Sequence, residues 1–292
     1  MAVLNIPSKK QASAMKLTAL GMIGALSLSA CSLFENPTPD PTLVELAATA
    51  SSDATYFEAE AQAGNAVAYN QSGFELRSTQ QAELITMIQD VCGRNEANQL
   101  PESCEHDAID TEIAAATAAL PTEREHLDAA ASQLWQNFVH APAASWPLLI
   151  EQFQQLRELG AANPASTTNV AITRAPTEDV TAATEYLYQA SYALGVVAAF
   201  GDADVASQAT DMLALFQQQI GVLQAMVSNG ASPAVAYEFT TFSEPVDADT
   251  AAETLAQITA GVQQLWQHEI TDSSNAQWQE LCMLFVGELA AL

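Results

Sequence analysis

The chain has 292 residues, with 8 Lys and Arg against 35 Asp and Glu and a formal net charge of −27 at pH 7. This charge excludes a nucleic-acid-binding protein, because an acidic surface repels phosphate. Hydrophobic residues make up 49% of the chain and charged residues 15%. Such a composition can bury a core and is not that of a disordered chain.

Residues 1–30 have the layout of a secretory signal peptide. Three lysines precede an uncharged, mostly apolar run at 17–30 (LTALGMIGALSLSA), which is too short for an ordinary membrane span. Cys31 follows directly, and residues 28–31 (LSAC) resemble the lipobox of bacterial lipoproteins. That resemblance implies lipidation of Cys31, which becomes the mature first residue. The alternative is a soluble secreted protein in which Cys31 is incidental. Translation can start at Met1 or at Met15.

Residues 31–42 are predicted to tether the lipid to the folded body. Residues 32–42 (SLFENPTPDPT) contain three prolines, which favour an extended backbone. From Cys31 onward the chain carries 5 Arg, no Lys and all 35 acidic residues, a formal charge of −30. Anionic headgroups repel such a body. We therefore expect an extracytoplasmic protein, anchored to the cell membrane through Cys31 and held off its surface.

Cysteine usage is consistent with an oxidising compartment. Cys92 and Cys104 flank a polar loop between two helical patterns, which favours a local disulfide. A metal or redox pair is the alternative, although this spacing fits neither a zinc knuckle nor a Cys-x-x-Cys motif. Cys282 lies beside an apolar helical seam and is predicted to be a buried free thiol.

The amino-terminal half, residues 43–160, is predicted to be helical, because apolar residues recur every three or four positions and β-branched runs are short. A polar stretch with Pro164 follows at 161–175 and is the candidate domain boundary. The helices are expected at 43–69, 74–93, 109–120, 122–139 and 145–160.

The carboxy-terminal half, residues 176–292, contains four amphipathic patterns, at 177–200, 203–229, 248–271 and 275–291. Asp247 is the expected N-cap of the third helix, and Ser274 with Gln277 has capping-box spacing before the fourth. Residues 231–245 can reach about 50 Å when extended, whereas the second helix spans about 40 Å. The linker can therefore cross the whole bundle, as in ferritin-like folds. We expect an all-α protein with a ferritin-like four-helix bundle and additional amino-terminal helices.

The carboxy-terminal half resembles a ferritin-like domain of unknown function found in lipoproteins of actinobacteria. Residues 192–197 (YALGVV), 230–237 (GASPAVAY) and 246–247 (VD) carry the resemblance, with Ala251, Ala252 and Leu255 after them. An acidic–histidine pair expected in the family before residue 192 is replaced here by Tyr186, Leu187 and Tyr188. The resemblance implies a fold and a cell-envelope location, and no activity.

A di-iron centre is not expected in this bundle. Ferritin-like di-iron proteins need a Glu on each of two helices and a Glu-x-x-His on each of the other two. The helix at 203–229 contains neither Glu nor His, and Met283 and Ala291 occupy the positions where the last helix would need His. The remaining candidates are two acids expected to face away from the core and one at the last turn of its helix: Glu185, Glu253 and Glu269.

Two acidic–histidine pairs in the amino-terminal half are the candidate positions for a weak divalent-metal site. Glu123 and His126 form the chain's Glu-x-x-His spacing, and Glu105 and His106 follow Cys104. Because Glu is common in this chain, one Glu-x-x-His spacing is expected by chance, and a solvated loop is the favoured alternative for the second pair. Apart from these pairs, no cofactor is expected.

The sequence favours a non-catalytic binding or interaction module at the cell envelope, with an unknown envelope protein or ligand as its partner. It contains no nucleophile-elbow, zinc-protease, phosphate-loop or EF-hand motif. The alternative is a metal-binding ferritin-like protein with an incomplete carboxylate and histidine site. A two-lobed solute-binding protein would need strands. One aromatic group either lines a ligand groove or packs as core: Tyr186, Tyr188, Tyr192, Tyr237, Phe239 and Phe242.

Overall fold

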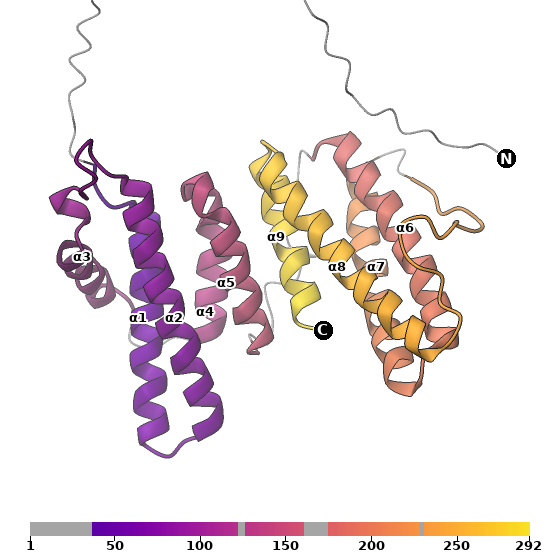
Figure 1. The fold of residues 1–292 in the computed structure, drawn as a ribbon, viewed down its shortest axis with the longest axis horizontal. Helices are drawn as coiled ribbons and strands as arrows, with labels where there is room; N and C mark the ends of the chain where they lie inside the picture. The colour runs from indigo at the N-terminus through magenta and orange to yellow at the C-terminus, as the bar shows by residue number, and fades with distance from the viewer. Residues whose placement is uncertain (1–36, 122–125, 161–174, 228–230) are drawn as a thin grey trace, which may run out of the picture. The chain divides into compact units, whose positions relative to one another are not determined.

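The computed structural model describes residues 37–121, 126–160, 175–227 and 231–292. Throughout these residues the regular structure is helical, with no strand, which confirms the all-α class (Figure 1). The predicted signal peptide, Cys31 and most of the predicted linker lie outside the described residues, and so does Glu123. The longer helices are α1 (Pro41–Gln62), α2 (Val67–Cys92), α3 (His106–Ala118), α4 (His126–Asn137), α5 (Trp146–Glu158), α6 (Thr177–Phe200), α7 (Ala203–Met226), α8 (Ala248–Asp272) and α9 (Ala276–Ala290).

Helices α1 and α2 form a long hairpin. The start of α1 and the turn between the two helices differ from the sequence prediction. Helix α1 begins at Pro41, where the Asp40 side chain accepts a hydrogen bond from Leu43 N at 3.1 Å. The last two residues assigned to the tether are therefore helical. Gly64 takes a positive φ of 83°, and Asn65 N donates to Glu60 O at 3.0 Å. This glycine ends α1 seven residues before the predicted boundary, so α2 begins at residue 67 and not at 74.

The predicted disulfide between Cys92 and Cys104 is present, with an S–S distance of 2.09 Å. It joins the end of α2 to a short 3₁₀ turn, η1 (Glu102–Cys104), that precedes α3. Ser103 Oγ of this turn donates to the carbonyl oxygen of Pro37. The first described residues of the chain are thus held against the disulfide loop.

The carboxy-terminal half contains the four predicted helices, with boundaries within a few residues of the prediction. Asp247 caps α8 in a capping box with Thr250. The cap of α9 differs from the prediction, because Asn275, and not Ser274, accepts the hydrogen bond from Trp278 N at 3.0 Å. The described part of the crossover, residues 231–247, contains no helix and leads to the start of α8 at the far end of the bundle (Figure 1).

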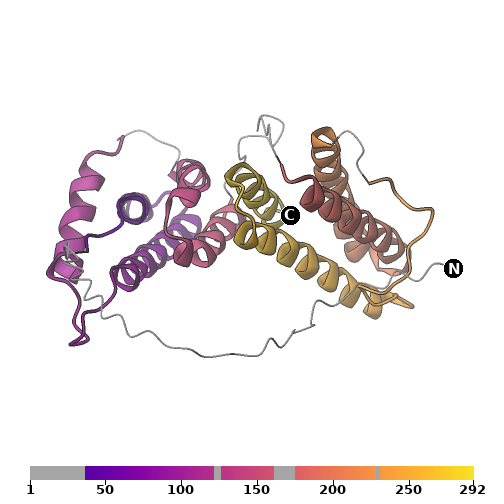
Figure 2. The same cartoon turned by 90° about the horizontal axis from the view of Figure 1, so that it is seen from above.

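Helix α9 lies at the centre of the fold and joins the two halves of the sequence. It packs against α8 on one side and against α5 and α4 on the other (Figure 2). Trp135 Nε1 of α4 donates to Glu280 O of α9 at 2.8 Å, and the aromatic ring of Phe153 lies directly against Gly287. Residues of both halves therefore share one hydrophobic core, and Asn36–Leu292 form one compact unit.

Candidate functional site

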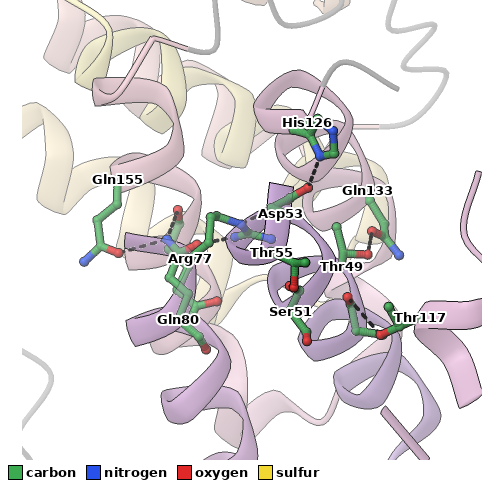
Figure 3. Close-up of polar contacts among 12 residues, drawn as sticks. Thr49, Ser51, Asp53, Thr55, Arg77, Gln80, Thr117, His126, Gln133 and Gln155 are labelled. Atoms are coloured by element: carbon green, nitrogen blue, oxygen red, sulfur yellow. Dashed lines mark hydrogen bonds and ion pairs between the residues drawn. The ribbon is translucent and has the colours of Figure 1, made fainter. Parts of the chain in front are cut away.

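The amino-terminal half contains a buried polar cluster, which we call the Asp53 cluster: Asp53, Arg77, Gln80 and His126 (Figure 3). Arg77 Nε donates to Asp53 Oδ2 at 3.0 Å, and His126 Nδ1 lies 2.8 Å from Asp53 Oδ1. The side chains of Asp53 and Arg77 are 0% and 4% exposed. One carboxylate therefore joins α1 to α2 through a guanidinium and to α4 through an imidazole.

Helical periodicity explains why Asp53 is buried. Thr49, Asp53 and Phe57 are spaced four residues apart on α1 and all three are buried, because residues at i and i+4 lie on the same face of a helix. On α2, Arg77 and Gln80 lie on the face turned toward the interior, and Arg77 Nη1 donates to the Gln80 side chain.

The cluster continues from α2 to α5 through two glutamines. Gln80 Nε2 donates to the backbone oxygen of Gln152 at 3.2 Å, and Gln152 Nε2 donates to the backbone oxygen of Gln80 at the same distance. Gln152 also contacts Glu83 at 3.1 Å. These reciprocal bonds satisfy buried amides that would otherwise destabilise the fold.

Aromatic rings cover the His126 end of the cluster. The Tyr56 ring stacks on the imidazole with a centroid distance of 3.7 Å and an interplanar angle of 15°, and the Phe57 ring lies 6.1 Å away. Phe57 also contacts Tyr69 of α2. Burial raises the pKa of Tyr69, and the Asp128 carboxylate raises it further.

Because Nδ1 of His126 faces the Asp53 carboxylate, the contact favours the His126 tautomer with its proton on Nδ1. Nε2 is then the lone-pair nitrogen, the arrangement in which a carboxylate orients a metal-binding or proton-accepting histidine. Across the described residues, no group of three His, Cys, Asp or Glu side chains is arranged to hold a metal ion. Glu123, the predicted companion of His126, lies outside those residues.

The other predicted acidic–histidine pair lies at the surface. Glu105 is the residue before α3, and His106 is the first residue of that helix. His106 Nε2 lies 3.4 Å from Asp110 Oδ2, and both side chains are at least half exposed. This is a solvated i,i+4 pair of the kind that contributes little to stability.

The acidic residues considered for a di-iron centre are dispersed. Glu185 and Glu253 are exposed, as predicted. Glu269 is partly buried and accepts a hydrogen bond from Trp278 Nε1 at 2.8 Å. Burial raises the pKa of Glu269, and the Trp278 N–H opposes that rise. On α9, Glu288, which lies three residues before Ala291, accepts a hydrogen bond from Gln219 Nε2 at 3.2 Å.

The aromatic residues of α6 and the crossover differ in burial, and most of them are partly buried. Phe242 is buried and its ring lies 5.9 Å from Tyr186, which is the core arrangement. Tyr192 is exposed and contacts Tyr237 and Phe239 at 5.8 and 6.0 Å. Tyr237 and Phe239 are partly buried, and Phe239 packs against the hydrophobic core.

Cys282 is a buried free thiol, as predicted. Burial raises its pKa well above the usual value, and the nearby Glu269 carboxylate acts in the same direction. A thiol of this kind is chemically unreactive in the folded protein.

Asp53 and Arg77 were not predicted as site residues from the sequence. A signal was present for Asp53, which is the charged residue on a buried α1 face that is apolar apart from Thr49, and a buried charge needs a partner. Arg77 gave no such signal, because its face of α2 also carries Asn70 and Gln80. No helix among the described residues has the length and apolarity to cross a membrane. No family model, curated protein or solved structure matches the chain.

Proposed function

We propose that this protein is a lipid-anchored, extracytoplasmic helical module that binds another component of the cell envelope. The observation that carries the proposal is the Cys92–Cys104 disulfide, because structural disulfides persist in oxidising compartments outside the cytoplasm. The lipobox at Cys31 supports the same location. In this proposal the disulfide loop, which contacts Pro37, holds the point where the tether joins the body.

The proposal includes membership of residues 176–292 in the ferritin-like group. Helix α6 packs against both α7 and α8, and α9 packs against α8, while a long crossover separates α7 from α8. This order of helices and connections supports the resemblance seen in the sequence.

Fatty-acid labelling tests the anchor. Cells expressing the full chain or its Cys31→Ser variant are fed an alkyne-tagged palmitate, and the label and the membrane fraction are compared. We expect the label and the membrane association in the wild type and the loss of both in the variant. Labelling that survives in Cys31→Ser, or a wild type without label, contradicts the anchor. Alkylation of intact cells then counts free thiols, and reactive Cys92 and Cys104 would contradict the oxidising location.

A second candidate function is metal binding in the amino-terminal half, which the pairing of His126 with Asp53 favours. Metal content of residues 32–292 is measured by plasma mass spectrometry in the wild type and in a Glu123→Ala/His126→Ala variant. His268→Ala is the control for the loss of an exposed histidine, because His268 forms a solvated i,i+4 pair with Asp272 at the surface. Stoichiometric metal that only the double variant loses would favour this function. Metal retained in the double variant, or absent from the wild type, would reject this site.

A further inference from the structure

The free end of the α1–α2 hairpin carries an unusual concentration of exposed apolar side chains. Figure 1 shows this end, where α1 turns into α2, extending beyond α3, α4 and α5. We call residues 55–75 the hairpin tip. Its exposed large hydrophobic residues are Tyr56 at 41%, Val67 at 42%, Tyr69 at 44% and Phe74 at 36%. Tyr56 and Tyr69 contact His126 and Phe57, whereas Phe74 lines a cleft of the hairpin tip. Phe74 is therefore the exposed ring that a partner can reach together with this cleft.

A small cleft opens between the two helices of the hairpin tip. Its volume is about 240 Å³, and it is lined by Glu58, Ala61, Gln62, Gln71 and Phe74. Pockets for small-molecule ligands usually measure at least about 300 Å³. This cleft is therefore better sized for one long side chain of a partner. The Phe74 ring and the Ala61 methyl group offer apolar contact, and Glu58 offers a carboxylate.

The charge around the cleft has one sign. Glu58 and Glu75 are exposed and Glu60 is partly exposed. Arg77, the arginine nearest in sequence, is buried and paired with Asp53. Among the described residues the exposed arginine is Arg94, which follows the opposite end of α2. A surface with this field attracts cations and repels a second copy of the same acidic chain.

We propose that the hairpin tip docks a basic peptide segment of a partner protein, with one arginine side chain entering the cleft between Phe74 and Glu58. The guanidinium stacks on the Phe74 ring and pairs with the Glu58 carboxylate, while its alkyl stem packs beside Ala61. Arginine suits this position better than lysine because its planar group both stacks and pairs with a carboxylate. This inference rests on the proposed binding function and names its surface and partner class.

A peptide titration tests the inference. The full chain, purified in a nonionic detergent, is titrated at physiological salt with a fluorescent peptide of alternating arginine and glycine. The test variant is Phe74→Ala/Glu58→Gln. The matched control is Phe200→Ala/Glu253→Gln, which removes an exposed ring and an exposed carboxylate from the other half of the chain. Thermal unfolding followed by circular dichroism verifies that both variants fold.

We expect the test variant to bind the peptide about fivefold more weakly, the combined size of one exposed cation–π contact and one exposed ion pair. The control variant should change affinity less than about twofold, because the charge it removes is distant and screened by salt. A peptide with citrulline in place of arginine should not bind. A photoreactive form of the arginine peptide should crosslink to residues 55–75.

Other outcomes overturn the inference. Equal weakening in both double variants would mean general attraction to an acidic body, and crosslinks outside residues 55–75 would move the site. No peptide binding, or a chain that dimerises through the hairpin tip, would also reject it. If the peptide binds elsewhere while palmitate labelling is intact, the docking site is wrong and the proposed function stands. If the wild type is not labelled with palmitate, the proposed function is contradicted, whether or not the peptide binds.

Discussion

Removal of the Asp53 side chain should destabilise the protein strongly. Asp53 is fully buried and receives hydrogen bonds from Arg77 at 3.0 Å and, with the imidazole proton on Nδ1, from His126 at 2.8 Å. Asp53→Ala leaves the Arg77 guanidinium buried without its carboxylate. Breaking a buried ion pair in this way costs about 3–5 kcal/mol, which is a large share of the roughly 5–15 kcal/mol that stabilises a typical domain.

A double variant separates the loss of the interaction from the burial of an unpaired charge. Asp53→Leu/Arg77→Met replaces both charged groups by apolar ones, and such replacements are often close to neutral. We expect this variant to lose less than about 2 kcal/mol, and therefore to be more stable than Asp53→Ala. Glu253→Ala, at an exposed position of α8, is the surface control and should change stability by less than about 0.5 kcal/mol.

Urea unfolding followed by far-ultraviolet circular dichroism gives these free energies, and tryptophan fluorescence tests whether the transition has two states. A loss below about 1 kcal/mol in Asp53→Ala would refute the reasoning, because it would mean that Arg77 finds solvent or another partner. Asp53→Leu and Arg77→Met are also measured singly, and a double variant that loses as much stability as the sum of these two losses would refute it as well.

Three further predictions follow from the packing of α7, α8 and α9. Gly287→Ala should lower the free energy of unfolding in urea by about 1–3 kcal/mol, because its Cβ would lie 2.4 Å from an aromatic ring atom of α5. Gly221→Ala, with no atom within 4 Å of its Cβ, should raise that free energy by about 0.5–1 kcal/mol. Equal effects of the two substitutions would contradict this packing. Burial raises the pKa of Glu269, so the folded state binds the carboxyl proton more tightly than the unfolded state does. The stability that this proton contributes is complete at pH values below the ordinary carboxyl pKa and is lost as the pH rises through the raised pKa. Glu269→Gln, which can still accept from Trp278, should therefore be more stable than wild type at pH 7 and equal to it near pH 4 in thermal unfolding, and an equal gain at both pH values would disprove the assignment. Cys282 should react with a thiol reagent only after unfolding, and stoichiometric reaction of the native protein would exclude its burial.

The helices were predictable because their signals are local. The four carboxy-terminal helices lie within a few residues of their predicted bounds, since apolar positions recur at helical spacing and caps such as Asp247 precede them. The disulfide was predictable for the same reason, because Cys92 and Cys104 are close in sequence and flank a short loop. Sequence reasoning was wrong at the hairpin turn, where Gly64 ends α1 within an alanine-rich stretch that also suits a continuous helix.

The Asp53 cluster required the tertiary structure. Asp53 and His126 are 73 residues apart, and Arg77 lies between them on another helix. Periodicity places each residue on a face of its own helix, but it does not say which faces meet. The metal hypothesis for His126 was based on sequence spacing to Glu123, whereas the contact in the structure is with a carboxylate of α1.

Composition, periodicity and short motifs are properties of neighbouring residues. They were therefore sufficient to predict an all-α, strongly acidic protein and to indicate a lipid anchor at Cys31. Three features became visible in the tertiary structure alone: the two halves share a core around α9, one carboxylate joins three helices, and Phe74 lines an exposed cleft of the hairpin tip. These features depend on contacts between residues distant in the chain, which form when apolar faces are buried together.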